Sequence, residues 1–311
     1  MDDELLAVRV AELYYDENKT QDEIGALLGI SRWKAGRLLS QARERGIVRI
    51  EIVHPRARRL ASERELRDRF GLADAVVVPT PDGEAGVQER VAQAASDFLT
   101  GLRPVPRTLG VSWGRTLTEV AERMPEGWAT GVTVVQINGG VSLNRRPGTA
   151  STLASTIAQR ANGHAILLPS PAILERLATK KAIESDRTVA AVLERAAEAN
   201  AYLFSAGVVD ANSAHVESGY LRPDDMEELA RRGAIGDVVG RYIDANGNIV
   251  DPALDERTLG ISLDTLRAAA MAILVIAGTA KHDIARAVVT SGLCTVLITD
   301  EATARALLED S

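Results

Sequence analysis

From residue 73 to the end of the chain, apolar segments of strand length alternate with amphipathic helical segments, and no other feature constrains the fold as strongly. Nearly continuous apolar strands separated by helices are typical of a parallel sheet that is covered on both faces. The sequence therefore predicts an α/β fold, a Rossmann-like domain with a mostly parallel sheet. The predicted strands are Ala75–Pro79, Thr108–Ser112, Val132–Ile137, His164–Leu168, Ala201–Gly207, Ala272–Gly278 and Cys294–Thr299.

The segments between these strands have helical periodicity, with one exception. The predicted helices are Val87–Leu102, Ser185–Glu198, Asp224–Arg232 and Ala280–Thr290. The segment Asp244–Asp251 departs from the pattern, and its Asn-Gly pair is a turn signal. We expect a small hairpin there, at the rim of the domain.

The segment Thr20–Leu39 has the pattern of two short helices joined by a tight turn. Thr20 is suited to cap the first helix, and Glu23 would complete a capping box. Gly29 interrupts the apolar pattern at the point where a left-handed turn is needed, and Ser31 is suited to cap the second helix. This combination predicts a helix-turn-helix that can lie in the major groove of DNA. The alternative is an ordinary pair of amphipathic helices.

The second of these helices would bury three apolar side chains against the first, with Gly25 at the point where the helices cross. Its outward face would then be basic, which suits contact with phosphates and base edges. We expect seven residues to contact DNA: Thr20, Gln21, Ser31, Arg32, Trp33, Lys34 and Arg37.

Two further segments flank this motif. Gly46–Val53 alternates apolar and charged residues, which predicts a strand like the wing of a winged helix. Arg56–Phe70 is charged and helical in pattern, and we interpret it as a connector helix, with a solvated linker as the alternative. The predicted domains are residues 1–54 (DNA binding), 55–72 (linker helix) and 73–311 (the α/β domain).

The charge of the chain is uneven. The formal net charge of −7 by itself argues against a nucleic acid partner. From Arg32 to Arg69, however, there are 12 Lys or Arg against 5 Asp or Glu, so basic charge gathers next to the predicted recognition helix. Part of this excess has the alternative interpretation of a solvated helix surface.

Three features indicate a cytoplasmic protein. Cys294 is the only cysteine, so no disulfide forms within the chain, as is usual in a reducing compartment. The N-terminus is acidic and lacks the apolar run of a secretory signal. No run of 18 apolar residues is present, so we expect no membrane span.

Ligands of open parallel sheets bind beyond the carboxyl ends of the strands, so the residues that follow each strand are candidates for a site. Ser112, Gly114, Arg115 and Thr116 lie where a strand leads into a helix. Free backbone N–H groups, a glycine, hydroxyls and a cation are suited to hold a phosphate. The alternative is a plain strand-to-helix turn.

Five further candidates come from other segments. Asn138, Gly139 and Gly140 follow a strand, and paired glycines would let a ligand lie against the backbone. Asp237 lies among small residues and could accept hydrogen bonds from sugar hydroxyls; the alternative is a turn-stabilising role. Lys281 begins a helix at the ligand edge, where an anion would suit it, with a solvated surface lysine as the alternative.

The sequence indicates neither metal binding nor catalysis. The histidines are widely spaced, Cys294 lies within a predicted strand, and no serine has the context of a nucleophile elbow. We therefore expect no metal, no cofactor and no enzymatic activity.

Several motifs occur in the order known from one protein family. They are TQ-x-E-I, LGIS-R and AR-x-x-GIV-x-I near the N-terminus, then GVSWG-x-TL, VVQ-x-NGG, GAIGD, G-x-YID-x-x-G, AG-x-x-K and LITDEATA-x-x-LL. Over nearly its whole length the chain resembles the SorC/DeoR-type sugar-responsive transcriptional regulators of bacteria. The resemblance implies an effector domain similar in fold to sugar-phosphate isomerases and glucosamine-phosphate deaminases, and a homo-oligomer that is typically a tetramer on DNA.

The resemblance also implies residue roles. Ser112, Gly114, Arg115, Thr116 and Lys281 would hold the phosphate of a sugar phosphate, while Asn138, Gly139, Gly140 and Asp237 would line the sugar. Trp33 replaces a common proline and Gly36 a common serine, which implies a different operator. Arg115 stands where a small or hydroxyl residue is common, which implies a more anionic or differently placed effector.

We therefore expect a DNA-binding transcriptional regulator of a carbohydrate-metabolism operon, a repressor controlled by a sugar or sugar-phosphate effector. One alternative is a sugar-phosphate isomerase or deaminase that carries a DNA-binding head. Another is a sensor that acts through protein partners.

Overall fold

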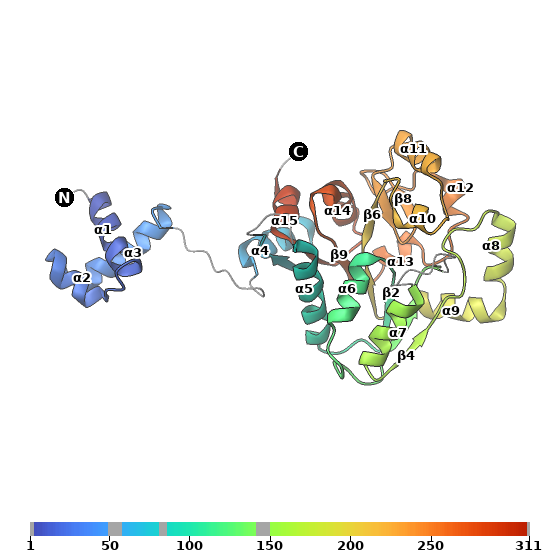
Figure 1. Cartoon of the computed structure of the whole chain (residues 1–311), viewed down its shortest axis with the longest axis horizontal. Helices are drawn as coiled ribbons and strands as arrows, with labels where there is room; N and C mark the ends of the chain where they lie inside the picture. The colour runs from blue at the N-terminus through green and yellow to red at the C-terminus, as the bar shows by residue number, and fades with distance from the viewer. Residues whose placement is uncertain (1–2, 49–57, 81–85, 141–149, 310–311) are drawn as a thin grey trace. The chain divides into compact units, whose positions relative to one another are not determined.

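The computed structural model describes residues 3–48, 58–80, 86–140 and 150–309 (Figure 1). The chain forms two compact units, residues 1–54 and 55–311.

The first unit contains three helices, α1 (Asp3–Tyr15), α2 (Gln21–Leu28) and α3 (Arg32–Glu44). The predicted capping box is present, since the Glu23 N–H donates to Thr20 Oγ1 and the Thr20 N–H donates to Glu23 Oε2. Gly29 adopts the left-handed conformation, with φ of 65°, and Ser31 caps α3 by accepting from the Lys34 N–H. Side chains from all three helices form the core of this unit: Leu6, Val10, Leu13, Ile24, Ala35, Leu38 and Leu39.

Two features of this unit refine the sequence prediction. A Cβ atom on Gly25 would lie 2.7 Å from the Ile30 carbonyl oxygen, so the turn backbone rests directly on α2. Of the predicted wing, the structure describes only residues 46–48, which form a turn and a bend. The remainder of that prediction lies outside the described residues.

The second unit is built on a seven-stranded parallel sheet in the order β1-β10-β9-β5-β2-β3-β4. Every strand predicted for this sheet is present. The strands are β1 (Asp74–Val78), β2 (Thr108–Val111), β3 (Thr133–Gln136), β4 (His164–Ile166), β5 (Ala201–Phe204), β9 (Ala272–Val275) and β10 (Val296–Asp300).

Helices cover both faces of this sheet, and each face has its own core. One core contains Val91, Leu117 and Leu153, from helices that lie next to one another in Figure 1: α5 (Val87–Gly101), α6 (Arg115–Arg123) and α7 (Ala150–Arg160). The opposite core receives side chains from α4 (Leu60–Phe70), α9 (Arg187–Ala197), α13 (Leu263–Arg267), α14 (His282–Thr290) and α15 (Glu301–Leu308). The helix α8 (Leu177–Glu184) has no fully buried residue.

Helix α4 is part of the second unit. Leu66 is fully buried in its core, and the carboxylate of Glu63, 4% exposed, accepts from the Val77 N–H (2.9 Å) and from Arg58 Nε (2.7 Å). These contacts fasten the helix to β1. The described part of the predicted linker therefore contains a helix that packs one face against the sheet and exposes the other.

A second, antiparallel sheet was not predicted from the sequence. Its strands are β6 (Ala206–Val208), β7 (Gly236–Val238) and β8 (Arg241–Ile243), paired in that order. The hairpin predicted at the Asn-Gly pair extends it, with a bridge between Ile243 and Ile249. The short helices α10 (Ala214–Glu217), α11 (Pro223–Arg231) and α12 (Pro252–Asp255) belong to the same part of the chain.

Within the described part of the chain, no helix combines the length and the apolar character needed to cross a bilayer.

Candidate functional site

The candidate effector residues lie at the carboxyl ends of strands and on the small sheet. Ser112 to Thr116 follow β2, and Asn138 to Gly140 follow the neighbouring strand β3. Lys281 ends the short helix η1 (Thr279–Lys281) after β9, and Asp237 lies on β7.

The N-terminus of α6 is open in the manner expected of an anion site. Gly114 precedes the helix with φ of 138° and ψ of 168°, and no side chain caps the helix among the described residues. Ser112 and Thr116 are buried, whereas Arg115 is exposed. The unsatisfied N–H groups of a helix N-terminus favour negative charge, and Arg115 adds a cation at the same place.

The packing of the chain requires glycine at both positions after β3, which the sequence pattern does not reveal. A Cβ on Gly139 would lie 2.1 Å from the Pro171 carbonyl oxygen, and one on Gly140 would lie 2.4 Å from Ala150 Cβ. The two glycines therefore allow other segments of the chain to approach, and not only a ligand. Asn138 is 2% exposed, and its Oδ1 has no hydrogen-bond partner among the described residues.

Asp237 has a structural role in the small sheet. Its Oδ2 accepts from the Gly240 N–H (3.0 Å) and so stabilises the turn between β7 and β8. Its Oδ1 lies 3.9 Å from His215 Nδ1. A Cβ on Gly207, the residue paired with Asp237, would lie 2.2 Å from the same Oδ1. The hairpin therefore holds one carboxylate oxygen, and the absence of a side chain at Gly207 leaves room for the other.

Lys281 connects the separate motifs electrostatically. Burial lowers the pKa of its amine, the negative charge of Asp237 raises it, and the positive charge of Arg115 lowers it further. The charges of Asp237 and Arg115, which belong to two other segments, therefore both act on the Lys281 amine.

A cluster of rings borders Asp237, and the sequence analysis did not predict it. His215 is buried, and its Nδ1 lies 2.8 Å from Tyr242 Oη, while its ring packs edge-on against Trp113 (5.7 Å between centroids). Trp113 Nε1 donates to the Gly139 carbonyl (2.7 Å), which links the cluster to the loop after β3. The fourth ring is that of Tyr220, and burial raises the pKa of its hydroxyl to about 12.

The only signal for this cluster is compositional. Aromatic residues make up 4% of the chain, yet three of them meet here from segments far apart in the sequence. No spacing rule brings such residues together before the fold is known.

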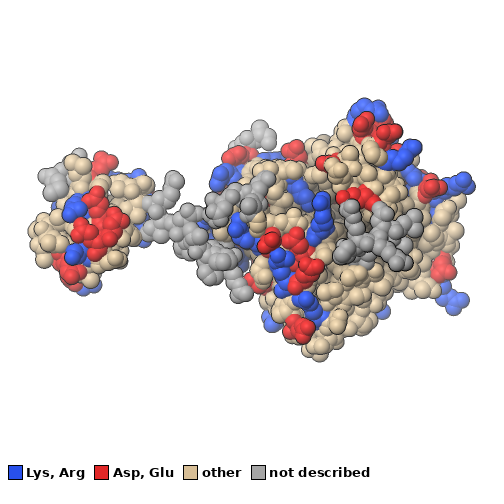
Figure 2. All heavy atoms as spheres, viewed as in Figure 1, with Lys and Arg blue, Asp and Glu red and all other residues tan. Residues whose placement is uncertain are grey.

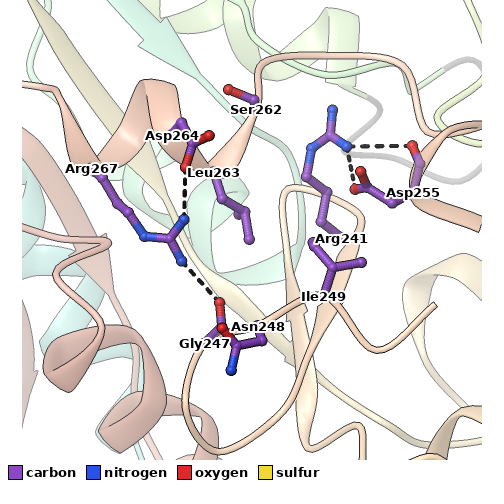
Figure 3. A pocket seen from close by; sticks show the side chains of 9 residues that line it. All are labelled: Arg241, Gly247, Asn248, Ile249, Asp255, Ser262, Leu263, Asp264 and Arg267. Carbon is purple, nitrogen blue, oxygen red and sulfur yellow. Dashed lines mark hydrogen bonds and ion pairs between the residues drawn. The ribbon is translucent and has the colours of Figure 1, made fainter. Parts of the chain in front are cut away.

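The described part of the chain also has a cavity of about 300 Å³ (Figure 3). Arg241 spans it, donating to the Ile261 carbonyl (2.9 Å) and pairing with Asp255. Arg267 pairs with Asp264 (2.9 Å) and donates to the Gly247 carbonyl (2.9 Å). Both guanidinium groups fasten loops to one another. None of the nine candidate effector residues lines this cavity or a second one, of about 370 Å³, near Glu126 and Arg160.

The candidate DNA-contacting residues lie on the first unit. Ser31 and Arg32 begin α3, Arg37 is exposed one turn later, and Trp33 is 87% exposed. Arg32 also forms an ion pair with Asp22 (3.5 Å), and the Gln21 side chain lies over Gly36. On the face drawn in Figure 2, basic and acidic side chains are interleaved on each unit.

No group of three or more potential metal ligands occurs among the described residues. Cys294 is buried, and burial raises the pKa of its thiol to about 12, which makes it an inert core residue.

Comparison with known proteins gives consistent matches over the whole chain. Residues 54–309 match the family model described as "Putative sugar-binding domain". The deoxyribonucleoside regulator of Bacillus subtilis is 33% identical over 98% of this chain and 97% of its own length. The sorbitol operon regulator of Klebsiella pneumoniae is 30% identical over 99% of both chains. The crystal structure of the full-length regulator SorC from Klebsiella pneumoniae has a TM-score of 0.73 and 28% identity, and the match covers 99% of this chain and 100% of that one.

Proposed function

The chain belongs to the sugar-binding domain family of transcriptional regulators, and from this premise we propose that it represses a carbohydrate-metabolism operon and releases the operator when a sugar or sugar phosphate binds. One observation carries the proposal: the match to the sorbitol operon regulator covers both units of the chain and not the larger one alone. A regulator needs both a DNA-binding part and a sensing part, and the chain has the length for both.

The first unit would act as the DNA-binding helix-turn-helix. The capped helix α2, the left-handed Gly29 and the capped helix α3 support this proposal. The contacts would come from Thr20, Gln21, Ser31, Arg32, Trp33, Lys34 and Arg37.

The second unit, residues 73–311 with the preceding helix, would bind the effector. The opening of α6, with Ser112, Gly114, Arg115 and Thr116, would hold an anionic group together with Lys281. Asn138, Gly139, Gly140 and Asp237 would border the hydroxyl-bearing part. The unpartnered Asn138 Oδ1 supports this assignment, because a buried polar atom without a hydrogen bond is costly unless a ligand or water pairs with it.

The effector must bind the DNA-competent and DNA-incompetent states with different affinities, because equal affinities shift no equilibrium. We propose that it changes the geometry of a homo-oligomer, a tetramer of two dimers, and so the spacing of the α3 helices. The protein would act in the cytoplasm, where the DNA is.

Two experiments test the proposal. The purified chain should retard a promoter fragment from its own genomic neighbourhood, with an affinity that falls steeply as salt rises. A thermal-shift screen with sugars and sugar phosphates should find a ligand that raises the melting temperature and weakens this retardation. Failure to bind any such fragment at low salt would overturn the DNA-binding half.

The enzymatic alternative has its own readout. The relatives named above are regulators. The His215–Asp237 pair, with 3.9 Å between Nδ1 and Oδ1, is the arrangement that an enzyme would use for acid–base chemistry. Steady turnover of a sugar phosphate that is lost in Asp237→Asn would favour an enzyme. The same substitution in a pure sensor should change effector affinity without any turnover to lose.

A further inference from the structure

Trp33 is exposed to an unusual degree. Its side chain is 87% exposed, whereas the other two tryptophans of the chain are partly buried (Trp113) or 8% exposed (Trp128). Tryptophan is a residue that proteins usually bury, and where it is exposed it is enriched at interfaces. A role in contacting a partner therefore accounts better for its position than a role in the fold.

The helical geometry places Trp33 at the centre of the outward face of α3. The four fully buried residues of α3 are Ala35, Leu38, Leu39 and Ala42. At 3.6 residues per turn, Trp33 lies opposite the mean direction of these four, and Arg37 follows it one turn later on the same face. Arg32 and Lys34 lie to either side of this line.

This arrangement is suited to a helix lying in the major groove. In that groove the two flanking cations would face the phosphate backbones on either side, and the central pair would face the base edges. An indole has one N–H donor and no acceptor, so it cannot form the paired hydrogen bonds that recognise adenine or guanine. Its large apolar surface matches the one apolar group that the major groove presents, the 5-methyl group of thymine.

We propose that Trp33 is a specificity-determining residue that recognises the methyl group of a thymine in each operator half-site, while Arg37 recognises a guanine near it. The inference rests on the proposed DNA-binding role of this unit. Side chains four residues apart on a helix are about 5–6 Å apart, and bases follow one another at about 3.4 Å. The thymine and the guanine therefore lie within about two base pairs of each other.

The test separates the methyl group from every other property of the base. Binding sites are first selected from random DNA with the full-length wild-type chain at fixed salt. Each thymine of the selected site is then replaced in turn by uracil, which lacks only the methyl group. For the wild type we expect one position per half-site at which uracil weakens binding about fourfold, the value for one buried methyl group.

Three variants complete the experiment. Trp33→Ala should bind the thymine and uracil versions of that position equally, whereas Trp33→Phe should still distinguish them. Arg37→Ala should keep the distinction but lose the preference for guanine within two base pairs. Because Trp33 contributes nothing to the buried core, the circular dichroism spectrum and melting temperature of Trp33→Ala should match those of the wild type.

The possible failures are distinct. If the wild type selects a sequence but no uracil substitution weakens its binding, or if Trp33→Ala retains the fourfold effect, the role of Trp33 is wrong and the DNA-binding function stands. If the wild type selects no sequence at all, the proposed function itself fails. A uniform loss for Trp33→Ala with every operator version would indicate a contact to the sugar-phosphate backbone and would also overturn the inference.

Discussion

Two charges act on the Lys281 amine: the carboxylate of Asp237 stabilises its positive charge, and the guanidinium of Arg115 opposes it. Burial and Arg115 lower the pKa of its amine below the ordinary value of 10.5, and Asp237 raises it in part. The folded chain therefore holds this proton less tightly than the unfolded chain. The contribution of Lys281 to stability is least favourable at low pH and improves as pH rises from the lowered pKa toward 10.5. An anionic ligand would reverse this preference by favouring the ammonium form.

The affinity for an anionic effector should accordingly fall with rising pH, and at a lower pH than an unperturbed lysine would give. Calorimetric titrations of the chain with the effector at several pH values from 7 to 10 would measure this change in affinity. Lys281→Arg is the matched control, because its charge persists and should flatten the profile over this range. Lys281→Met should abolish the effector response while leaving operator affinity unchanged. A Lys281→Met variant with a normal response would remove the residue from the site.

The glycines of the first unit differ in what a methyl group would meet. At Gly25 a Cβ would press on the Ile30 carbonyl at 2.7 Å, which is backbone and cannot turn aside. At Gly36 the nearest atom is Gln21 Oε1 at 3.1 Å, the end of a flexible side chain. We expect Gly25→Ala to lower the free energy of unfolding of this unit by about 1–3 kcal/mol.

Gly36→Ala is the control for the change in helix propensity, because both glycines lie within helices. It should be neutral or stabilising by up to about 1 kcal/mol. Hydrogen exchange of the backbone amides of α1 to α3 measures the free energy of unfolding of this unit in both variants. Equal effects of the two substitutions would contradict the assigned packing of the turn on α2.

At the scale of elements, the strands of the large sheet were predictable because burial on both faces leaves an almost continuous apolar run. β9 and β10 show this clearly, since every residue in both strands is buried. The turn and caps of α2 and α3 were predictable because Gly29 and Ser31 act locally. The seven-strand order was not, because it depends on contacts between distant segments.

The small sheet and the ring cluster could not be predicted for a related reason. β6, β7 and β8 are three residues each, too short for an alternating pattern to emerge. His215 on α10 and Tyr242 on β8 are 27 residues apart in the sequence, and only the fold makes them neighbours. Asp237 and Lys281 stand out in the sequence only by their neighbours in the chain, and the action of the Asp237 charge on Lys281 depends on the fold.

Helix α4 offers a direct test of where the second unit begins. Leu66 is fully buried, whereas Leu60 on the same helix is 63% exposed. Leu66→Ala should cost about 2–5 kcal/mol of stability in the second unit, and Leu60→Ala less than about 0.5 kcal/mol. Urea unfolding followed by tryptophan fluorescence would measure the stability of the second unit, because Trp113 and Trp128 both lie in this unit. Equal urea midpoints for the two variants would indicate that α4 is a solvated linker and not part of the second unit.

At the scale of the whole molecule, sensing and DNA binding are assigned to different units, so they can influence each other only through a change of state. The chain has a net charge of −7, yet basic residues gather around the segment that would meet DNA. An acidic remainder discourages non-specific attachment of nucleic acid elsewhere.

Thermodynamic linkage makes this coupling testable without knowledge of the conformational change. If the effector weakens operator binding by some factor, the operator must weaken effector binding by the same factor. We expect a factor of about 5–150, the usual range for such coupling. Titrating the full-length chain with effector, with and without saturating operator, gives one factor, and titrating operator with and without effector gives the other. A scrambled DNA duplex is the control and should leave effector affinity unchanged. Unequal factors would show that the effector acts through a second, unrecognised binding event. If neither ligand changes the affinity of the chain for the other, the effector does not control DNA binding.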